Sequence, residues 1–313
     1  MKKILLVGFG NLGFYYLKTI NNIKNITQCD VYDKSKTNLK RINKYNFSNI
    51  SKIKILSNLE YAKNYDLCIV STKSDVRFDI IKTLINKKNT KFLTEKILFT
   101  NYSDHKKICN KIKSKKIKIW VNFNSRIQTW WQHIKKLNQL HEPISLIVDG
   151  GNIGLCTSGI HILDLFEYLT DHKIDRNKIS LQNIKSFVNK KLHHDLSGSI
   201  LYKNHNKSLF INFQDNYKNN LPIFIFTNRS SRFILQPNEG IFIKINLLTN
   251  KIDKKTNLNI KENLLSYYSK DLLENILFEN KCSLPLLENT TNIHRIIYDI
   301  NAKFFANKKN LPT

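Results

Sequence analysis

The chain has 313 residues, of which 41% are hydrophobic, so it is long enough for two domains with ordinary hydrophobic cores. Its 51 basic and 24 acidic residues give a formal net charge of +27, but most of the basic residues are lysines spread along the whole chain. Arginine, which base recognition favours, is scarce, and no apolar run approaches the roughly 20 residues that span a bilayer, so we expect neither a nucleic-acid nor a membrane partner.

The first predicted strand, Lys3–Val7, runs directly into a G-x-G-x-x-G loop that opens a helix. Gly8 allows the tight turn, Gly10 lets the backbone approach a pyrophosphate, and Gly13 lets the helix pack on the sheet. The free backbone N–H groups at the start of this helix would then face the diphosphate of a dinucleotide. The predicted phosphate-binding residues are Gly8, Gly10, Asn11, Leu12 and Gly13.

The second predicted strand ends in a carboxylate, Asp33, which lies 20 residues after Gly13. An acid at this place accepts hydrogen bonds from the ribose hydroxyls of NAD and repels the 2′-phosphate of NADP. The sequence therefore predicts a dinucleotide-binding protein that uses NAD, with NADP the less favoured cofactor.

Strands and helices continue to alternate up to residue 121, as a parallel sheet requires. Beyond Asp33 the predicted helices cover residues 36–45, 75–86 and 104–113, and the predicted strands cover residues 53–56, 65–72, 91–94 and 117–122. In open α/β sheets, ligands bind outside the carboxyl ends of the strands, so the side chains there should converge on one crevice. The residues at these ends are Gly8, Asp33, Thr72, Glu95, Lys96 and Asn122.

Two places along the chain carry candidate acid–base residues. Lys96 follows a predicted strand at the sheet edge where a nicotinamide should lie, and a partly desolvated amine there suits proton transfer. The alternative is a surface lysine in a lysine-rich chain. A predicted helix over residues 158–169 then puts His161, Asp164 and Tyr168 on one face, where the acid would orient the imidazole. The alternative is a buried histidine satisfied by its own aspartate.

Beyond residue 170 the sequence predicts a meander of antiparallel strands, followed by two amphipathic helices that pack on the outside. The predicted strands cover residues 197–202, 208–213, 222–227, 231–235 and 241–245, and the predicted helices cover residues 264–277 and 291–305. The five cysteines are scattered and contain no C-x-x-C pair, so we expect free thiols, a cytoplasmic protein and no metal site.

Taken in order and at these separations, the glycine loop, Val70-Ser71-Thr72, Thr94-Glu95-Lys96 and Gly159–Leu165 resemble the Gfo/Idh/MocA oxidoreductases, closely over residues 1–170 and loosely beyond. The resemblance implies an α/β protein with an N-terminal Rossmann dinucleotide-binding domain (residues 1–121), followed by an α+β domain with a large, mostly antiparallel open sheet (residues 122–313). It also implies an NAD(P)-dependent dehydrogenase or reductase acting on a hydroxyl or ketone of a sugar, sugar phosphate or nucleotide sugar, and a homodimer or homotetramer.

The resemblance also assigns roles to individual residues. The implied catalytic residues are Lys96, His161 and Asp164. The implied contacts to the cofactor include Thr72, Glu95 and Lys96, and the implied contacts to the substrate are Asn122, Arg126 and Thr157.

Three departures from the family pattern qualify these roles. Ile97 stands where the family usually has proline, residues 72–77 keep only the threonine of the family motif, and Thr157 stands where an aspartate is common. These losses leave a cofactor-binding sensor with weakened catalysis as the alternative to an enzyme. The net charge leaves a nucleic-acid-binding protein as a further alternative, which predicts DNA binding that weakens steeply with salt.

Overall fold

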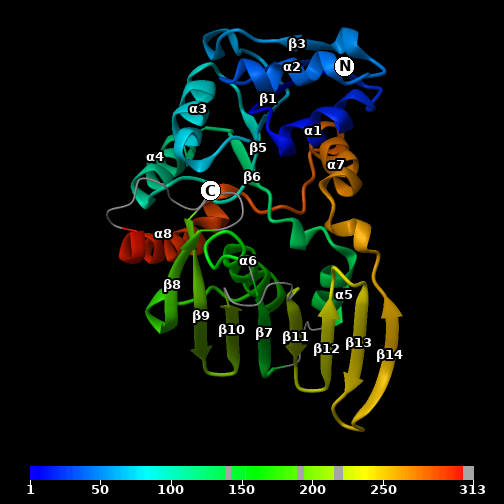
Figure 1. Cartoon of the computed structure of the whole chain (residues 1–313), viewed down its shortest axis with the longest axis vertical. Coiled ribbons are helices and arrows are strands. Elements are labelled where there is room, and N and C mark those ends of the chain that lie inside the picture. The colour runs from blue at the N-terminus through cyan, green and yellow to red at the C-terminus, as the bar shows by residue number, and fades with distance from the viewer. Residues whose placement is uncertain (114, 138–141, 152, 189–193, 215–220, 306–313) are drawn as a thin grey trace. The chain divides into compact units, whose positions relative to one another are not determined.

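The computed structural model describes residues 1–113, 115–137, 142–151, 153–188, 194–214 and 221–305 (Figure 1). The chain divides into two compact units. The first unit comprises Met1–Phe123 and Leu264–Thr291, and the second comprises Asn124–Asn263 and Asn292–Thr313. This differs from the division expected after residue 121, because residues 264–291 pack with the first unit instead of the second.

The first unit contains a six-stranded parallel sheet in the order β3-β2-β1-β4-β5-β6. Its strands are β1 (Lys2–Val7), β2 (Ile26–Tyr32), β3 (Ile53–Ile55), β4 (Leu67–Val70), β5 (Lys91–Thr94) and β6 (Lys118–Val121). Its helices are α1 (Asn11–Asn21), α2 (Lys36–Lys44), α3 (Ser74–Asn86), α4 (Tyr102–Lys113) and α7 (Leu265–Glu274). The predicted Rossmann fold is confirmed, and its strand order reverses between β1 and β4, where such folds bind ligands.

Helix α7 explains why residues 264–291 belong to the first unit. It packs beside α1, as Figure 1 shows. The hydroxyl oxygens of Thr19 on α1 and Ser269 on α7 lie 2.7 Å apart, and both side chains are buried. The amphipathic pattern over residues 264–277 correctly predicted a helix, but a pattern cannot reveal which unit its apolar face covers.

The second unit contains an eight-stranded sheet in the order β14-β13-β12-β11-β7-β10-β9-β8. Its strands are β7 (Ile144–Gly151), β8 (Ile179–Val188), β9 (His194–Asn204), β10 (Lys207–Gln214), β11 (Ile223–Thr227), β12 (Ser231–Gln236), β13 (Ile241–Asn246) and β14 (Lys251–Asn257). Strands β7 and β10 are parallel and the other described pairings are antiparallel, so the mostly antiparallel sheet is confirmed. The predicted meander is interrupted, because β7 lies between β10 and β11 and buries Leu146 and Val148 there.

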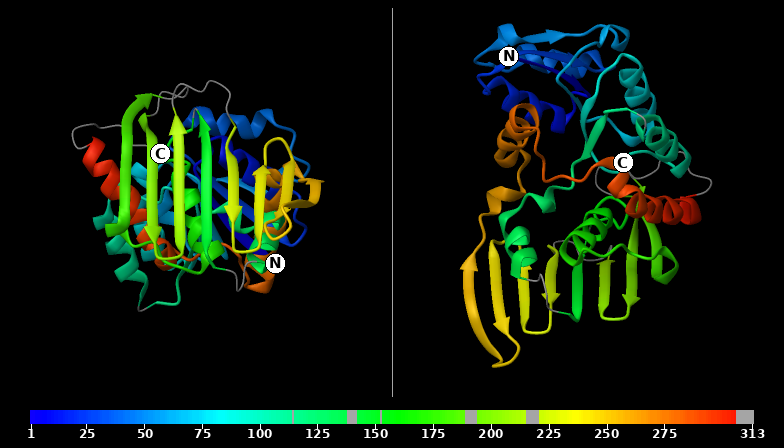
Figure 2. Two further views of the ribbon diagram at one scale, coloured as in Figure 1. Left: turned by 90° about the horizontal axis from the view of Figure 1, so that it is seen from below. Right: turned by 180° about the vertical axis from the view of Figure 1, so that it is seen from behind.

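The helices of the second unit are α5 (Thr129–Leu137), α6 (Gly159–Thr170) and α8 (Thr291–Phe305). Helix α6 packs on β7 and β10 and also contacts α5. In the left view of Figure 2 the strands lie in front and these helices lie behind them, so the described helices cover one face of the sheet and leave the other open. Among the helices that the structure describes, none is long and apolar enough to cross a lipid bilayer.

Candidate active site

The glycine loop between β1 and α1 has the form that a bound diphosphate requires. Gly8 has a φ of +91°, and a Cβ atom there would lie 2.8 Å from Thr72 Cγ2, so the position accepts only glycine. A Cβ atom on Gly13 would lie 2.0 Å from the carbonyl oxygen of Gly8, so the helix packs tightly against the turn. A Cβ atom on Gly10 would meet no atom within 4 Å, so this part of the loop faces open space. The loop therefore leaves room for a diphosphate, and the binding of one by these residues stays a prediction.

Asp33 is held in place at the end of β2. Its carboxylate accepts hydrogen bonds from the backbone N–H of Phe9 at 2.6 Å, the backbone N–H of Ser35 at 2.7 Å and Asn38 Nδ2 at 3.2 Å. A cavity of about 330 Å³ opens beside it. The predicted residues that line this cavity are Gly8, Gly10, Asp33 and Thr72. The geometry thus fits an NAD-binding crevice in which the glycine loop orients Asp33.

Glu95 and Asn122, at the ends of β5 and β6, form a buried cluster. Glu95 Oε1 accepts hydrogen bonds from the Tyr16 hydroxyl at 2.9 Å and from Asn122 Nδ2 at 3.0 Å. Asn122 Nδ2 also lies 3.3 Å from the hydroxyl oxygen of Tyr268 on α7. Burial, with the Glu95 carboxylate nearby, raises the pKa of Tyr16 well above its ordinary value. Lys96 is the next residue after this cluster and is partly exposed. The cluster therefore fixes the sheet edge that carries Lys96, while contacts of Glu95 with cofactor and of Asn122 with substrate stay predictions.

The second unit contains a cavity of about 680 Å³, and His161 lies in its wall. Ser158 and His161 reach it from the start of α6, and three aromatic side chains, Trp131, Phe213 and Phe224, also line it. Amide side chains complete the polar part of the wall, namely Asn124, Gln128, Asn238 and Asn263. Apart from His161, no described lining residue has an ionisable side chain.

His161 is the one residue of this wall that the sequence predicts as functional. Phe213 and Phe224 lie inside predicted strands, so their burial was expected, but an alternating pattern does not distinguish a core from a cavity. The adjacent tryptophans at 130 and 131 are the one signal that was available, because two large aromatic residues beside polar amides are typical of a binding surface.

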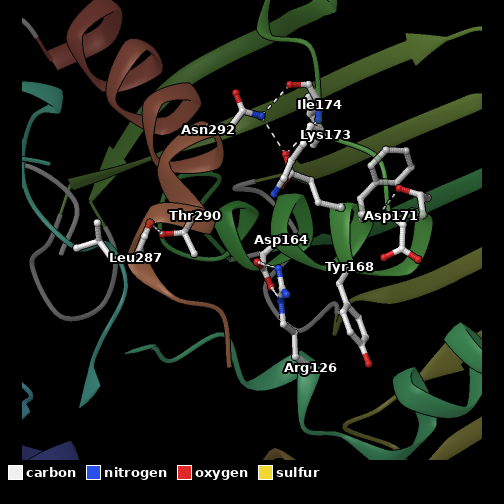
Figure 3. Close-up of polar contacts among 12 residues, drawn as sticks. Arg126, Asp164, Tyr168, Asp171, Lys173, Ile174, Leu287, Thr290 and Asn292 are labelled. Carbon is white, nitrogen blue, oxygen red and sulfur yellow. Dashed lines mark hydrogen bonds and ion pairs between the residues drawn. The ribbon is translucent and has the colours of Figure 1, made fainter. Parts of the chain in front are cut away.

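Asp164 and Arg126 form a two-point ion pair (Figure 3). Arg126 Nε lies 2.8 Å from Asp164 Oδ2, and Arg126 Nη2 lies 2.7 Å from Oδ1. Burial raises the pKa of Asp164 and the guanidinium opposes this shift. The guanidinium also lies over the ring of Tyr168, 5.2 Å from its centroid. Asp164 and Tyr168 of the predicted helix face thus both contact Arg126. The orientation of His161 by Asp164, and the contact of Arg126 with substrate that the resemblance implies, stay predictions.

The loop before α6 is held by a carboxylate from β9. Asp195 is 1% exposed, and it accepts hydrogen bonds from the backbone N–H groups of Cys156 at 3.0 Å and Leu196 at 2.8 Å. The Thr157 hydroxyl donates to Asp195 Oδ2 at 2.5 Å. A Cβ atom on Gly154 would lie only 1.7 Å from the same oxygen, so the loop closes tightly on the carboxylate. Thr157 thus has a partner within the protein, and its predicted contact with substrate stays a prediction.

Known proteins resemble this chain in the sequence of its first unit and in its overall fold. Residues 2–123 match the GFO_IDH_MocA family model, described as an oxidoreductase family with an NAD-binding Rossmann fold, so the predicted cofactor NAD is confirmed at the level of the family. No curated protein shows significant sequence similarity to this chain.

Many solved structures share the fold of this chain. The UDP-N-acetylglucosamine 3-dehydrogenase of Acidithiobacillus ferrooxidans is 10% identical, with a TM-score of 0.76, and the match covers 97% of this chain and 98% of that one. The scyllo-inositol dehydrogenase of Lactobacillus casei with bound NAD(H) and scyllo-inositol is 14% identical, with a TM-score of 0.72 and 98% of each chain covered. An Agrobacterium radiobacter oxidoreductase in complex with NAD+, L-tartaric acid and magnesium is 13% identical, with a TM-score of 0.76, 98% of this chain and 97% of that one covered. At these identities the likeness concerns the fold.

Proposed function

We propose that this chain, whose residues 2–123 match the GFO_IDH_MocA family model, transfers a hydride between NAD and a hydroxyl or ketone carbon of a sugar-type ring. The observation that carries the proposal is the position of His161 in the wall of a cavity of about 680 Å³. Among the described residues that line this cavity, only His161 has an ionisable side chain. A single imidazole in such a wall is suited to exchange a proton with a bound hydroxyl.

When bound, NAD supplies the carbon that accepts or gives up the hydride. The chain's own residues supply binding and proton transfer. The turn at Gly8 and Gly10 accommodates the diphosphate, and the Asp33 carboxylate accepts hydrogen bonds from the ribose hydroxyls. We assign Lys96 to donate a hydrogen bond to the reacting oxygen, and His161 to take up the hydroxyl proton during oxidation and return it during reduction.

The ring bound in the second unit is, in this proposal, an uncharged polyol or aldose. Hydroxyl groups both donate and accept hydrogen bonds, which suits amides such as Asn124, Gln128 and Asn263. The C–H faces of such a ring suit the aromatic part of the wall. A phosphate or carboxylate on the ring would face no described basic side chain in this cavity. Scyllo-inositol, which is bound in the Lactobacillus casei structure, is an uncharged cyclic polyol and is therefore the first probe to use.

The proposal is tested by nicotinamide absorbance in single-turnover experiments with NAD and a panel of inositols, aldoses, sugar phosphates and nucleotide sugars. We expect reduction of NAD with at least one uncharged member. Lys96→Met and His161→Asn should each lower the rate about 10²- to 10⁴-fold and leave NAD binding nearly unchanged. Lys91→Met, at the start of the strand that precedes Lys96, is the matched control and should keep the wild-type rate. Wild-type turnover in Lys96→Met would remove this lysine from the chemistry.

The same experiment distinguishes an enzyme from a cofactor-binding sensor. Tight NAD binding without reduction on any member of the panel would favour the sensor and contradict the proposed function. Reduction of NAD only with phosphorylated or nucleotide-linked members would support an enzyme but contradict the assignment of an uncharged ring.

We also propose that the open face of the eight-stranded sheet joins two copies of this chain. A row of apolar side chains crosses this face, one from each of six adjacent strands, and each is directly opposite its neighbour in the register. The row consists of Leu201, Phe210, Ile147, Ile225, Ile234 and Ile243. On one side it is flanked by a polar row that includes Ser208, Ser145 and Thr227. An apolar stripe with a polar border is typical of a protein interface.

Light scattering coupled to gel filtration tests this interface. The wild type should be a dimer or tetramer, and Ile225→Asp in the middle of the row should give monomers, because a carboxylate would be buried there without a partner. Leu248→Asp, at a residue that is 80% exposed in the turn after β13, is the control and should leave the assembly unchanged. A monomeric wild type, or an unchanged assembly in Ile225→Asp, would contradict the proposal.

We further propose a cytoplasmic location. All five cysteines are free thiols, and Cys29, Cys68 and Cys156 among them are buried. A reducing compartment keeps such thiols unpaired, whereas secreted proteins of comparable cysteine content commonly form disulfides. Cell fractionation with an antibody to the chain would test the location, and recovery from the medium or an extracytoplasmic compartment would contradict it.

A further inference from the structure

A single buried arginine connects the two strand ends next to Lys96. Arg77, which is 3% exposed, lies in the first turn of α3. Its Nη1 donates to the backbone carbonyl oxygens of Glu95 at 2.7 Å, Leu98 at 3.1 Å and Ile97. Its Nη2 donates to the carbonyl oxygen of Thr72. One guanidinium therefore binds three carbonyls that bracket Lys96 and a fourth at the wall of the cofactor cavity.

The local structure explains how the side chain reaches these carbonyls. Arg77 shares the buried face of α3 with Ile80, Ile81 and Leu84, at helical spacing. Side chains on a helix lean toward its N-terminus, so a long side chain in the first turn extends back over the segment that precedes the helix. A cation in the first turn also opposes the helix dipole, which is unfavourable. The four carbonyl oxygens offset this by supplying the negative end of four peptide dipoles.

We propose that Arg77 is a positioning residue that fixes the backbone of residues 95–98 and so sets the direction in which Lys96 projects. Four backbone carbonyl oxygens accept hydrogen bonds from this one guanidinium, which supplies the donors that these buried acceptors need. The planar guanidinium has five N–H groups in a rigid fork, so its two Nη atoms can bind carbonyls from two strand ends at once. The ammonium of lysine has three donors on one nitrogen and cannot span both strand ends.

This inference rests on the proposed role of Lys96, but part of its test does not. Amide hydrogen exchange is measured by mass spectrometry on wild type and Arg77→Lys, each with and without NADH. Arg77→Lys keeps the charge and loses the fork. We expect peptides covering residues 94–100 to exchange at least 10-fold faster, while peptides from α4 stay within twofold of wild type, since a charge-assisted hydrogen bond is lost only at the turn.

Kinetics with the substrate found in the panel form the second part of the test. We expect kcat of Arg77→Lys to fall about 10- to 100-fold with KM for NAD changed less than threefold, because a misplaced Lys96 affects the reacting state more than cofactor binding. Arg41→Lys is the matched control. Arg41 lies on α2 of the same unit with its guanidinium 5.0 Å from the ring centroid of Phe14, and its replacement should alter neither exchange at 94–100 nor kcat.

The outcomes separate this inference from the proposed function. If Arg77→Lys exchanges at the wild-type rate at residues 94–100, the positioning role is overturned. It is also overturned if exchange is faster throughout the first unit while kcat per folded molecule is unchanged. Selectively faster exchange at 94–100, in a protein whose wild type reduces NAD with no substrate, would support the role of Arg77 at the turn and overturn only the proposed function.

Discussion

Two backbone segments are held in a similar way, namely residues 95–98 in the first unit and residues 154–157 in the second. The side chains that hold them carry opposite charges. The first segment carries Lys96 and the second leads into the helix that carries His161, and each is held by one buried charged side chain from a different element. Arg77 binds the carbonyl oxygens of the first segment, whereas Asp195 binds N–H groups of the second.

The difference follows from the direction of the peptide groups. After β5 the chain turns so that carbonyl oxygens converge, and before α6 it turns so that N–H groups converge. A guanidinium offers only donors and a carboxylate only acceptors, so the charge that fits is dictated by the turn. A loop that carries a reactive group can therefore be held by a residue that is distant in sequence, and the sign of that residue's charge reports the orientation of the backbone.

The largest effect is expected when the anion of the second unit is removed. Asp195→Ala leaves the N–H groups of Cys156 and Leu196, and the hydroxyl of Thr157, without their acceptor in a buried place. We expect the free energy of unfolding to fall by about 4 kcal/mol. Urea denaturation measures this fall, and hydrogen exchange should report selective loss of protection in peptides covering residues 154–163.

Gly154 provides an internal check of this prediction. Gly154→Ala should destabilise the wild type, because its Cβ would lie 1.7 Å from Asp195 Oδ2, but it should be far better tolerated once Asp195 is alanine. The double-mutant cycle should give a coupling of about 2 kcal/mol. Asp299→Ala removes an exposed acid that pairs with Arg176 and should change stability by less than about 0.5 kcal/mol. Additive effects of the Gly154 and Asp195 substitutions would contradict the contact.

Acid should affect the first unit through a buried histidine. His105 on α4 is 0% exposed, and burial lowers its pKa from 6.5 to about 4. The unfolded chain therefore binds a proton between pH 6.5 and 4 that the folded chain does not. Stability from this residue is fully present above pH 6.5, is lost as pH falls to about 4 and changes no further below. The loss amounts to about 3 kcal/mol.

Urea midpoints between pH 7 and 4.5 test this prediction, and the slope against pH is the readout. His105→Gln has no titratable group at this place and should flatten the slope, even if its stability at pH 7 is lower. His133, in the second unit, is the control position, and His133→Gln should keep the wild-type slope. An unchanged slope in His105→Gln would show that other groups cause the acid sensitivity.

Sequence alone was sufficient where one pattern determined one structure. The strand, glycine loop and helix at residues 2–21 obey local rules, so the Rossmann unit and its cofactor NAD could be predicted, while the contact of Asp33 with the ribose stays a prediction. Strand β7 was missed, and its place between β10 and β11 is a long-range pairing that no local pattern encodes. Arg77 and Asp195 were missed for the same reason, because the backbone groups they bind come largely from other elements.

Thr157 yields the smallest expected effect and separates two roles. Thr157→Val keeps the shape of the side chain and removes the hydroxyl that donates to Asp195 Oδ2 at 2.5 Å. If this bond is the whole role of the hydroxyl, the free energy of unfolding falls by about 1 kcal/mol, with KM and kcat within twofold of wild type, whereas Thr157→Ser retains the donor and should restore most of the stability. If the hydroxyl also binds substrate, as the resemblance implies, KM in Thr157→Val rises by more than twofold over wild type. Paired measurement of urea midpoint and KM distinguishes the two, because the bond to Asp195 holds the loop whether or not substrate is bound.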